Sequence, residues 1–205
     1  TARGYKALVD RTVDIAMASG AVPDEVAIQL AGRQRTLYTT LISTDAVVPL
    51  VHASNPVSRL SLRQLTNIFS GRIRNWKEAG GADAPIHVLV GPPGGGVTRS
   101  FVQLVLGEDA TFTPSRSVLD TGKRLRQVAG DPCAITFVAM MPFDQRALKI
   151  VTVDGLQANA SMPATALRVP MILAVAGAQS GAARDFIAYA GRQWNFASEG
   201  GSGRE

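Results

Sequence analysis

The stretch DAVVPLVHASNPVSRLSLRQLTNIFSGRIRNWKE, residues 45–78, decides the fold of this chain. Its first apolar run, residues 46–52, is short and rich in valine, which is typical of a β-strand. Ser54-Asn55-Pro56 predicts a turn, because proline fixes its own φ and pushes the preceding residue out of the helical region. The stretch therefore opens with a strand that ends in a turn.

A helix follows in the second half of the stretch. Ser61 predicts its N-cap, because a serine side chain can accept a hydrogen bond from an otherwise unpaired backbone N–H, and Gly71 predicts its end. Four apolar residues share one face at helical spacing: Leu62, Leu65, Ile68 and Phe69. We therefore expect an amphipathic helix that buries this face.

Strands and helices alternate along the rest of the chain. The expected helices span residues 2–10, 24–31, 61–70, 98–106, 122–129 and 182–189, with Asp24 as the cap of the second. The expected strands span residues 13–18, 36–42, 46–52, 86–90, 134–140, 148–153 and 167–175. This alternation predicts an α/β architecture built on a mainly parallel sheet.

Composition fits a folded protein and argues against nucleic acid as a partner. Hydrophobic residues make up 46% of the 205 residues and charged residues 18%, which is far from the polar profile of disorder. The net charge is +5, but the basic residues are scattered. The densest group follows helical spacing, so we interpret it as a solvated helix face rather than a phosphate-tracking patch. Its members are Arg63, Arg72, Arg74 and Lys77.

The single cysteine, Cys133, excludes an internal disulfide and a cysteine-based metal site, and we expect neither a metal nor a cofactor. Its apolar surroundings, residues 133–138, predict a small buried side chain. No apolar stretch approaches the ~20 residues of a membrane span, and residues 169–176 predict a buried strand instead. The chain carries no signal peptide, so an exported protein is expected to have lost its leader already.

Residues 45–57, 60–65 and 68–78 resemble the phosphate-binding components of bacterial ABC importers. Two further segments are similar to that family: TVDIAMAS at residues 12–19 and DPCAITFV at residues 131–138. The segments follow the order of the family, and the resemblance covers nearly the whole chain.

The resemblance implies a two-lobed α/β fold of the type II periplasmic-binding kind, in which the lobes close on a ligand in the cleft. Lobe one is expected to comprise residues 1–52 and 141–205, and lobe two residues 53–140, with crossovers at residues 46–52 and after Met140. The family begins with a strand, a helix and another strand before the point where this chain starts. Lobe one is therefore expected to be incomplete and less stable than lobe two.

Two ligand positions implied by the resemblance lie in lobe one. The family holds its anion with a serine at the start of the helix that here spans residues 2–10, and Thr1 matches that serine. An ordinary N-cap threonine remains an equal alternative. The family places a charged, ligand-facing residue after the strand at residues 13–18, where this chain has Gly20. One charge of the family site is therefore missing.

The other implied positions follow the strand at residues 86–90. The family carries an arginine there and then Ser-Gly-Thr. In this chain Gly91 replaces the arginine, and Gly95, Gly96 and Val97 replace Ser-Gly-Thr. Because charge-assisted hydrogen bonds contribute about 1.5–3 kcal/mol each, we expect these replacements to weaken a phosphate site.

Two compensations remain open. A one-residue shift would bring Thr98 into the role of the lost threonine, with Arg99 beside it as a replacement charge. Alternatively, the amides of Gly94–Gly96 could form an anion-binding nest without side chains. If phosphate is bound, we expect its donors to be the amides of residues 94–98, with Arg99 or Arg3 supplying positive charge.

The leading hypothesis is a periplasmic or extracellular solute-binding protein. It would bind a small ligand, phosphate or another oxyanion, and deliver it to the membrane permease of an ABC importer. The alternative is a sensor or interaction module that keeps the fold with a degenerate pocket. An enzyme is not expected, because no nucleophile, base and orienting group can be assembled from the visible motifs.

Overall fold

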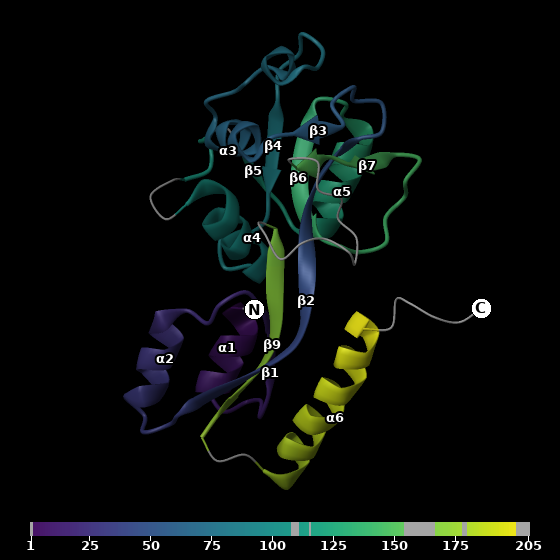
Figure 1. Cartoon of the computed structure of the whole chain (residues 1–205). Coiled ribbons are helices and arrows are strands. Elements are labelled where there is room, and N and C mark those ends of the chain that lie inside the picture. The colour runs from purple at the N-terminus through teal and green to yellow at the C-terminus, as the bar shows by residue number, and fades with distance from the viewer. Residues whose placement is uncertain (1, 108–110, 115, 154–166, 178–179, 200–205) are drawn as a thin grey trace, which may run out of the picture. The chain divides into compact units, whose positions relative to one another are not determined.

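The computed structural model describes residues 2–107, 111–114, 116–153, 167–177 and 180–199, with side chains described as far as residue 193. Helices and strands alternate along the chain, as the sequence predicts (Figure 1). The chain divides into two compact units. Unit 1 comprises Thr1–Asp45, Gly94–Gly96 and Val169–Glu205, and unit 2 comprises Ala46–Pro93 and Val97–Arg168. The lobe boundaries implied by the resemblance, 1–52 with 141–205 and 53–140, differ from this division and stay a prediction.

Unit 1 contains helices and a short sheet. The helices are α1 (Ala2–Val9), α2 (Asp24–Ala31) and α6 (Gly181–Glu199). The strands follow the order β1-β9-β2 and comprise β1 (Ala16–Ser19), β9 (Arg168–Ala176) and the first part of β2 (Leu37–His52). β1 is antiparallel to β9. The core between α1 and this sheet contains Tyr5, Leu8, Ala16, Ala18 and Ala174.

The first strand is shorter and more exposed than the sequence predicts. Residues 13–18 predict a buried strand, whereas β1 begins at Ala16 and its burial alternates. Ala16 and Ala18 are buried, and Met17 between them is 55% exposed. Because successive side chains of a strand point to opposite faces, an edge strand covered on one face buries every second residue.

Two other predictions for this part of the chain are wrong. Residues 36–42 and 46–52 predict two strands, but β2 is continuous because residues 43–45 keep an extended backbone. Asp24 predicts the N-cap of α2, but it is the first helical residue and Pro23 occupies the N-cap. Asp24 still favours the helix start, because a carboxylate is stabilised by the partial positive charge of a helix N-terminus.

Unit 2 contains a mixed sheet with the strand order β2-β6-β4-β5, and β7 pairs with β2. The strands are β4 (His87–Val90), β5 (Ser117–Val118), β6 (Ala134–Ala139) and β7 (Leu148–Ile150), with β3 (Arg59–Leu60) and β8 (Thr152–Val153) as a separate pair. β4 is parallel to β5 and β6, whereas β6 is antiparallel to β2. The prediction of a mainly parallel sheet is therefore wrong.

The helical segments of unit 2 are α3 (Leu62–Ser70), η1 (Trp76–Ala79), α4 (Gly96–Phe101), η2 (Val102–Leu106) and α5 (Thr121–Gly130). α3 forms as predicted. Ser61 Oγ accepts a hydrogen bond from Gln64 N at 3.1 Å, and Gln64 Oε1 accepts one from Ser61 N at 2.9 Å, which completes a capping box. Gly71 ends the helix in the left-handed region with φ 80°. The face buried by the helix comprises Leu65, Ile68 and Phe69.

Aromatic rings form much of the core of unit 2. Phe69 and Phe101 meet edge to face with ring centroids 4.7 Å apart, and Phe101 and Phe137 stack with centroids 3.8 Å apart. All three side chains are fully buried. Phe112 lies beside them, with its ring centroid 6.0 Å from that of Phe137. Because such pairs contribute about 0.5–1.5 kcal/mol beyond burial, this cluster fixes α3 and α4 against β6.

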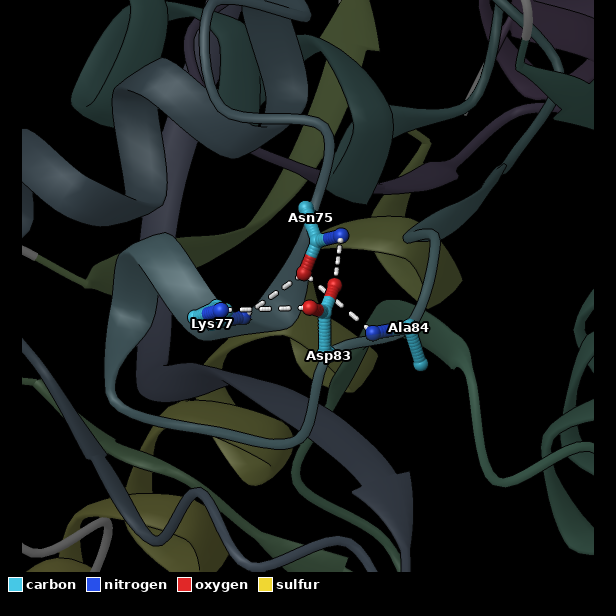
Figure 2. Close-up of polar contacts among 4 residues, drawn as sticks. All are labelled: Asn75, Lys77, Asp83 and Ala84. Atoms are coloured by element: carbon cyan, nitrogen blue, oxygen red, sulfur yellow. Dashed lines mark hydrogen bonds and ion pairs between the residues drawn. The ribbon is translucent and has the colours of Figure 1, made fainter.

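Polar contacts around Asn75 hold the loop before β4 (Figure 2). Asn75 Oδ1 accepts hydrogen bonds from Lys77 N at 2.9 Å and Ala84 N at 3.2 Å, and Asn75 Nδ2 donates to Asp83 Oδ1 at 2.8 Å. Lys77 Nζ pairs with Asp83 Oδ2 at 3.2 Å. These contacts close the loop around η1, so Asn75 has a structural role.

Cys133 is half-buried, so the prediction of a buried side chain is wrong. The residue lies in the turn before β6, where its backbone N–H donates to Asp131 Oδ1 at 2.9 Å. Its carbonyl accepts hydrogen bonds from Trp76 Nε1 at 2.9 Å and from His87 N at 3.0 Å. The backbone of Cys133, rather than its side chain, therefore connects η1, β4 and β6.

Candidate functional site

A pocket lies at the carboxyl end of β4 in unit 2. It is lined by residues of β4, α4, η2, β5 and the segments that follow β4 and precede β5. Its volume of about 320 Å³ falls at the lower end of the range for small-molecule sites, ~300–1,000 Å³. All of its described lining residues belong to unit 2.

Three residues singled out in the sequence, Gly91, Thr98 and Arg99, lie together in this pocket. Gly91 directly follows β4, and Thr98 belongs to α4 and is only 4% exposed. A Cβ built on Gly91 would lie 2.4 Å from Thr98 Oγ1, closer than real Cβ atoms approach. Position 91 therefore needs glycine, because Thr98 fills the space in which a side chain would begin.

The polar part of the pocket is positively charged. Arg99 and Arg116 both line it and are half-buried, and Arg116 Nη1 donates to the carbonyl of Thr113 at 3.0 Å. Among the lining residues that the structure describes, there is no aspartate or glutamate. The apolar wall consists of Val90, Val102, Phe112 and Val118. The pocket therefore combines positive charge with a hydrophobic wall.

A third arginine, Arg124 of α5, lies in the core of unit 2 and is only 3% exposed. Its Nη1 donates to Thr136 Oγ1 at 3.0 Å and to the carbonyl of Phe137. Its Nη2 donates to Thr121 Oγ1 at 3.2 Å. Its Cζ also lies 5.4 Å from the centroid of the Phe137 ring, within the range of a cation–π contact.

The guanidinium of Arg124 is charged at neutral pH. Burial lowers the pKa of Arg124 to about 10, although the charge of Asp120 acts in the opposite direction. Asp120 is an exposed residue that pairs with Lys123 at 3.7 Å. No carboxylate in the described ranges forms an ion pair with Arg124. Among the residues that the structure describes, Arg124 is thus a buried cation without a close counter-ion.

The remaining residues that the resemblance implied for the site are placed differently. Thr1 lies outside the described residues. Gly20 follows β1 in unit 1 with φ 84°, and its N–H donates to the carbonyl of Pro170 at 2.8 Å, which continues the antiparallel pairing of β1 with β9. Gly95 and Gly96 belong to unit 1, and Val97 of α4 is not among the residues that line the pocket. Their ligand roles stay predictions.

The sequence reasoning missed Arg116 and Arg124. Arg116 precedes a two-residue strand for which the sequence carries no periodic pattern, so no sequence signal indicated that Arg116 belongs to the pocket. Arg124 had a signal, because it lies four residues before Val128 on the expected helix and both are buried. A charged residue on the core-facing side of a helix indicates a buried polar site.

Metal binding and membrane insertion find no support in the described residues. No group of three or more His, Cys, Asp or Glu side chains in these ranges could hold a metal ion. In the same ranges, no helix has the length and apolar character needed to cross a membrane.

Comparison with known proteins places this fold in a family. Residues 1–190 match the model of the PBP superfamily domain. The chain is similar to the phosphate-binding protein PstS of Bacillus subtilis, with 31% identity over 124 residues. This match covers 58% of the chain and 41% of the relative, so the matched region spans less than half the length of that curated relative.

Solved structures agree with this assignment. The chain is similar to a putative phosphate ABC transporter substrate-binding protein with bound phosphate from Clostridium perfringens, with a TM-score of 0.81 and 25% identity over 97% of the chain and 82% of that structure. It also shares the fold of an ABC-type phosphate transport receptor from Vibrio cholerae, with a TM-score of 0.74 and 23% identity over 96% of the chain and 82% of that structure. The chain therefore belongs to the PBP superfamily, and it resembles the phosphate-binding proteins of ABC importers within it.

Proposed function

We propose that this protein binds a small oxyanion, phosphate or a related anion, in the pocket at the end of β4. The observation that carries the proposal is the set of pocket-lining side chains: Thr98, Arg99 and Arg116 together, with no acidic residue among the described lining residues. A pocket whose described lining contains two guanidinium groups and no carboxylate favours a ligand of negative charge.

The side chains of the pocket supply the donors that an oxyanion needs. A guanidinium offers a planar pair of N–H groups that matches two oxygens of a phosphate or carboxylate, and a threonine hydroxyl can donate one more hydrogen bond. Gly91 replaces the arginine that the related family carries, and Thr98 takes the role of its lost threonine only through a one-residue shift, so the donors come from different positions. We infer an altered oxyanion site in which Thr98 and Arg99 take the replacement roles, which is one of the two compensations that the sequence left open.

The relatives support a transport role. The Clostridium perfringens and Vibrio cholerae proteins are described as components of phosphate ABC transporters. We infer that this protein acts outside the cytoplasm and delivers its ligand to the membrane permease of an ABC importer. Genes for a permease and an ATPase beside the gene for this protein support transport, and their absence supports a sensor.

Isothermal titration calorimetry tests the binding proposal. The chain is titrated with phosphate, sulfate and methylphosphonate, and with glycerol as a neutral solute. At least one anion should bind while glycerol does not. The variants Arg99→Gln and Arg116→Gln should each lower the affinity for that anion about 10-fold, because each removes a charge-assisted hydrogen bond.

The matched control is Arg72→Gln, which removes the same charge from an exposed position of unit 2 outside the pocket. We expect the control to change the affinity less than 2-fold, because solvent and salt screen a distant surface charge. Equal losses in all three variants would show that net charge, rather than the pocket, attracts the anion. Binding of glycerol alone would contradict the proposal.

A further inference from the structure

Arg124 has hydrogen-bonding capacity that the core of unit 2 does not use. A guanidinium carries five N–H donors. Nη1 uses its donors on Thr136 Oγ1 and the Phe137 carbonyl, and Nη2 uses one on Thr121 Oγ1. Nε is buried and has no hydrogen-bond partner among the described residues. A buried charged donor left unpaired is costly, which points to a further partner for this side chain.

The guanidinium lies directly behind the pocket. A Cβ on Gly91 would lie 3.3 Å from Arg124 Nη2 and 3.6 Å from Arg124 Cζ, and 2.4 Å from Thr98 Oγ1. Gly91 and Thr98 both line the pocket. A glycine and a hydroxyl group therefore separate the buried charge from the pocket, and no apolar side chain at position 91 shields it.

The polar network fixes the orientation of Arg124. Thr136 Oγ1 accepts from Arg124 and donates to the carbonyl of Leu89 at 2.9 Å, which connects α5 with β6 and β4. Leu89 and Thr136 are buried, so this network is shielded from solvent. A rigid buried charge acts on a ligand more strongly than a mobile surface charge, because solvent screens it less and its orientation is set before binding.

We propose that Arg124 is the specificity-determining charge of the pocket and that a bound oxyanion serves as its counter-ion. The proposal rests on the proposed function, since it assigns a role to Arg124 in the same pocket. The positive charge favours an orientation in which the oxygen of Thr98 faces the guanidinium and its O–H points toward the ligand. Arg124 thus selects for anions through Gly91 and Thr98, and Arg99 and Arg116 contact the ligand from the pocket wall.

Three variants of α5 separate this role from a structural one. Arg124→Met removes the charge and keeps an unbranched side chain, and Arg124→Lys keeps the charge. Arg126→Met removes a charge from an exposed position on the same helix. Phosphate and sulfate are titrated into each variant by calorimetry, and circular dichroism verifies that each is folded. The temperature of unfolding is measured with and without each anion at about 10 mM. This concentration is chosen to exceed the Kd of a weak site.

Arg124→Met should lower anion affinity about 10- to 100-fold and abolish the anion-dependent rise in the temperature of unfolding. Arg124→Lys should retain binding within about 10-fold, and Arg126→Met within 2-fold. If wild type binds an anion and folded Arg124→Met binds it equally well, Arg124 is structural and the inference is wrong, although the proposed function stands. If wild type binds no anion, the proposed function and the inference both fail.

A second measurement serves if Arg124→Met does not fold. Buried arginine Nε–H groups exchange slowly enough to be observed by NMR, so the Arg124 Nε–H resonance is followed in the wild-type chain as phosphate is added. Its saturable shift, with the same Kd as the calorimetric titration, supports the inference. An unchanged Arg124 Nε–H resonance at saturating phosphate overturns it.

Discussion

The two units of this chain are built from different kinds of core. Unit 2 buries Phe69, Phe101 and Phe137 completely in one aromatic cluster. Unit 1 packs α1 on its sheet with many alanines and leaves large apolar side chains in solvent: Met17, Ile28, Tyr38, Leu41, Phe186 and Tyr189. Because burial of apolar area is the main source of stability, we expect unit 2, which contains the pocket, to be more stable than unit 1.

This difference has a consequence for binding. A pocket that selects a ligand through a buried charge needs a rigid surrounding, since a displaced guanidinium loses its orientation toward the ligand. In unit 2 one of the aromatic rings that fill the core also contacts Arg124, whose Cζ lies over Phe137. We therefore expect the aromatic core of unit 2 to hold the side chains of the pocket in place.

The largest expected effect is in the aromatic core. Phe101→Ala should lower the free energy of unfolding by about 3–5 kcal/mol, because it removes a fully buried ring and leaves a cavity beside Phe69 and Phe137. Urea denaturation followed by circular dichroism measures the change. The control is Phe186→Ala in unit 1, where the ring is 48% exposed and the cost should stay below about 1 kcal/mol. Equal costs would remove the contrast between the two cores.

Hydrogen exchange compares the units directly. Amides of β1 in unit 1 should open with a free energy at least about 1.4 kcal/mol lower than amides of β6 in unit 2, which is a tenfold faster exchange. The reason is that Met17 of β1 is exposed, whereas residues 134–138 of β6 are all buried. Exchange measured by NMR or mass spectrometry gives both values. Uniform protection would mean that unit 1 is as stable as unit 2.

A smaller effect is expected at the loop shown in Figure 2. Asn75→Ala should cost about 1 kcal/mol of unfolding free energy, because the N–H groups of Lys77 and Ala84 lose their acceptor. Lys77→Met is the control, since the exposed pair between Lys77 and Asp83 should contribute less than about 0.5 kcal/mol. A larger loss of unfolding free energy in Lys77→Met than in Asn75→Ala would show that the ion pair, rather than Asn75, stabilises the loop.

The smallest effect concerns Asp45, where burial raises the pKa of the carboxyl group. A raised pKa means that the ionised form destabilises the fold above that pKa, and that the cost disappears as the pH falls below the ordinary value of 3.8. Asp45→Asn should therefore stabilise the protein at pH 7 by at most about 0.5 kcal/mol and should have no effect at pH 3.

Asp10 provides the opposite case for the same experiment. A hydrogen bond from Lys6 lowers the pKa of Asp10, so its ionised form contributes stability at pH values above 3.8. Asp10→Asn should therefore destabilise the protein slightly at pH 7. Thermal unfolding of both variants at pH 3 and pH 7 measures whether each substitution stabilises or destabilises the protein. If both substitutions change the stability at pH 7 in the same direction, burial does not determine the pKa of Asp45.

Local signals in the sequence were enough to predict parts of this fold. The helix from Ser61 to Gly71 was predicted because its cap, its apolar face and its terminal glycine all lie within eleven residues. The continuity of β2 was not predictable in the same way, because residues 43–45 carry no strand signal of their own and are extended by their neighbours in the sheet. Pairing between distant strands overrides local preference.

The candidate site was predicted only where the resemblance provided positions. Gly91, Thr98 and Arg99 were named in advance and line the pocket, and their ligand roles stay predictions. Arg116 and Arg124 were not, because they come from segments that are distant in sequence from the glycine-rich loop. Their proximity depends on the packing of α5 and β5 beside β4, which a single sequence does not reveal.

The central claim is that an oxyanion occupies the pocket of unit 2, and anomalous diffraction tests it most directly. A crystal of the full chain is soaked in selenate, whose selenium atom can be located independently of the protein atoms. We expect an anomalous peak inside the pocket, within hydrogen-bonding reach of Thr98 and of the Arg99 or Arg116 side chain. A selenium peak elsewhere with this pocket empty at saturating selenate would contradict it.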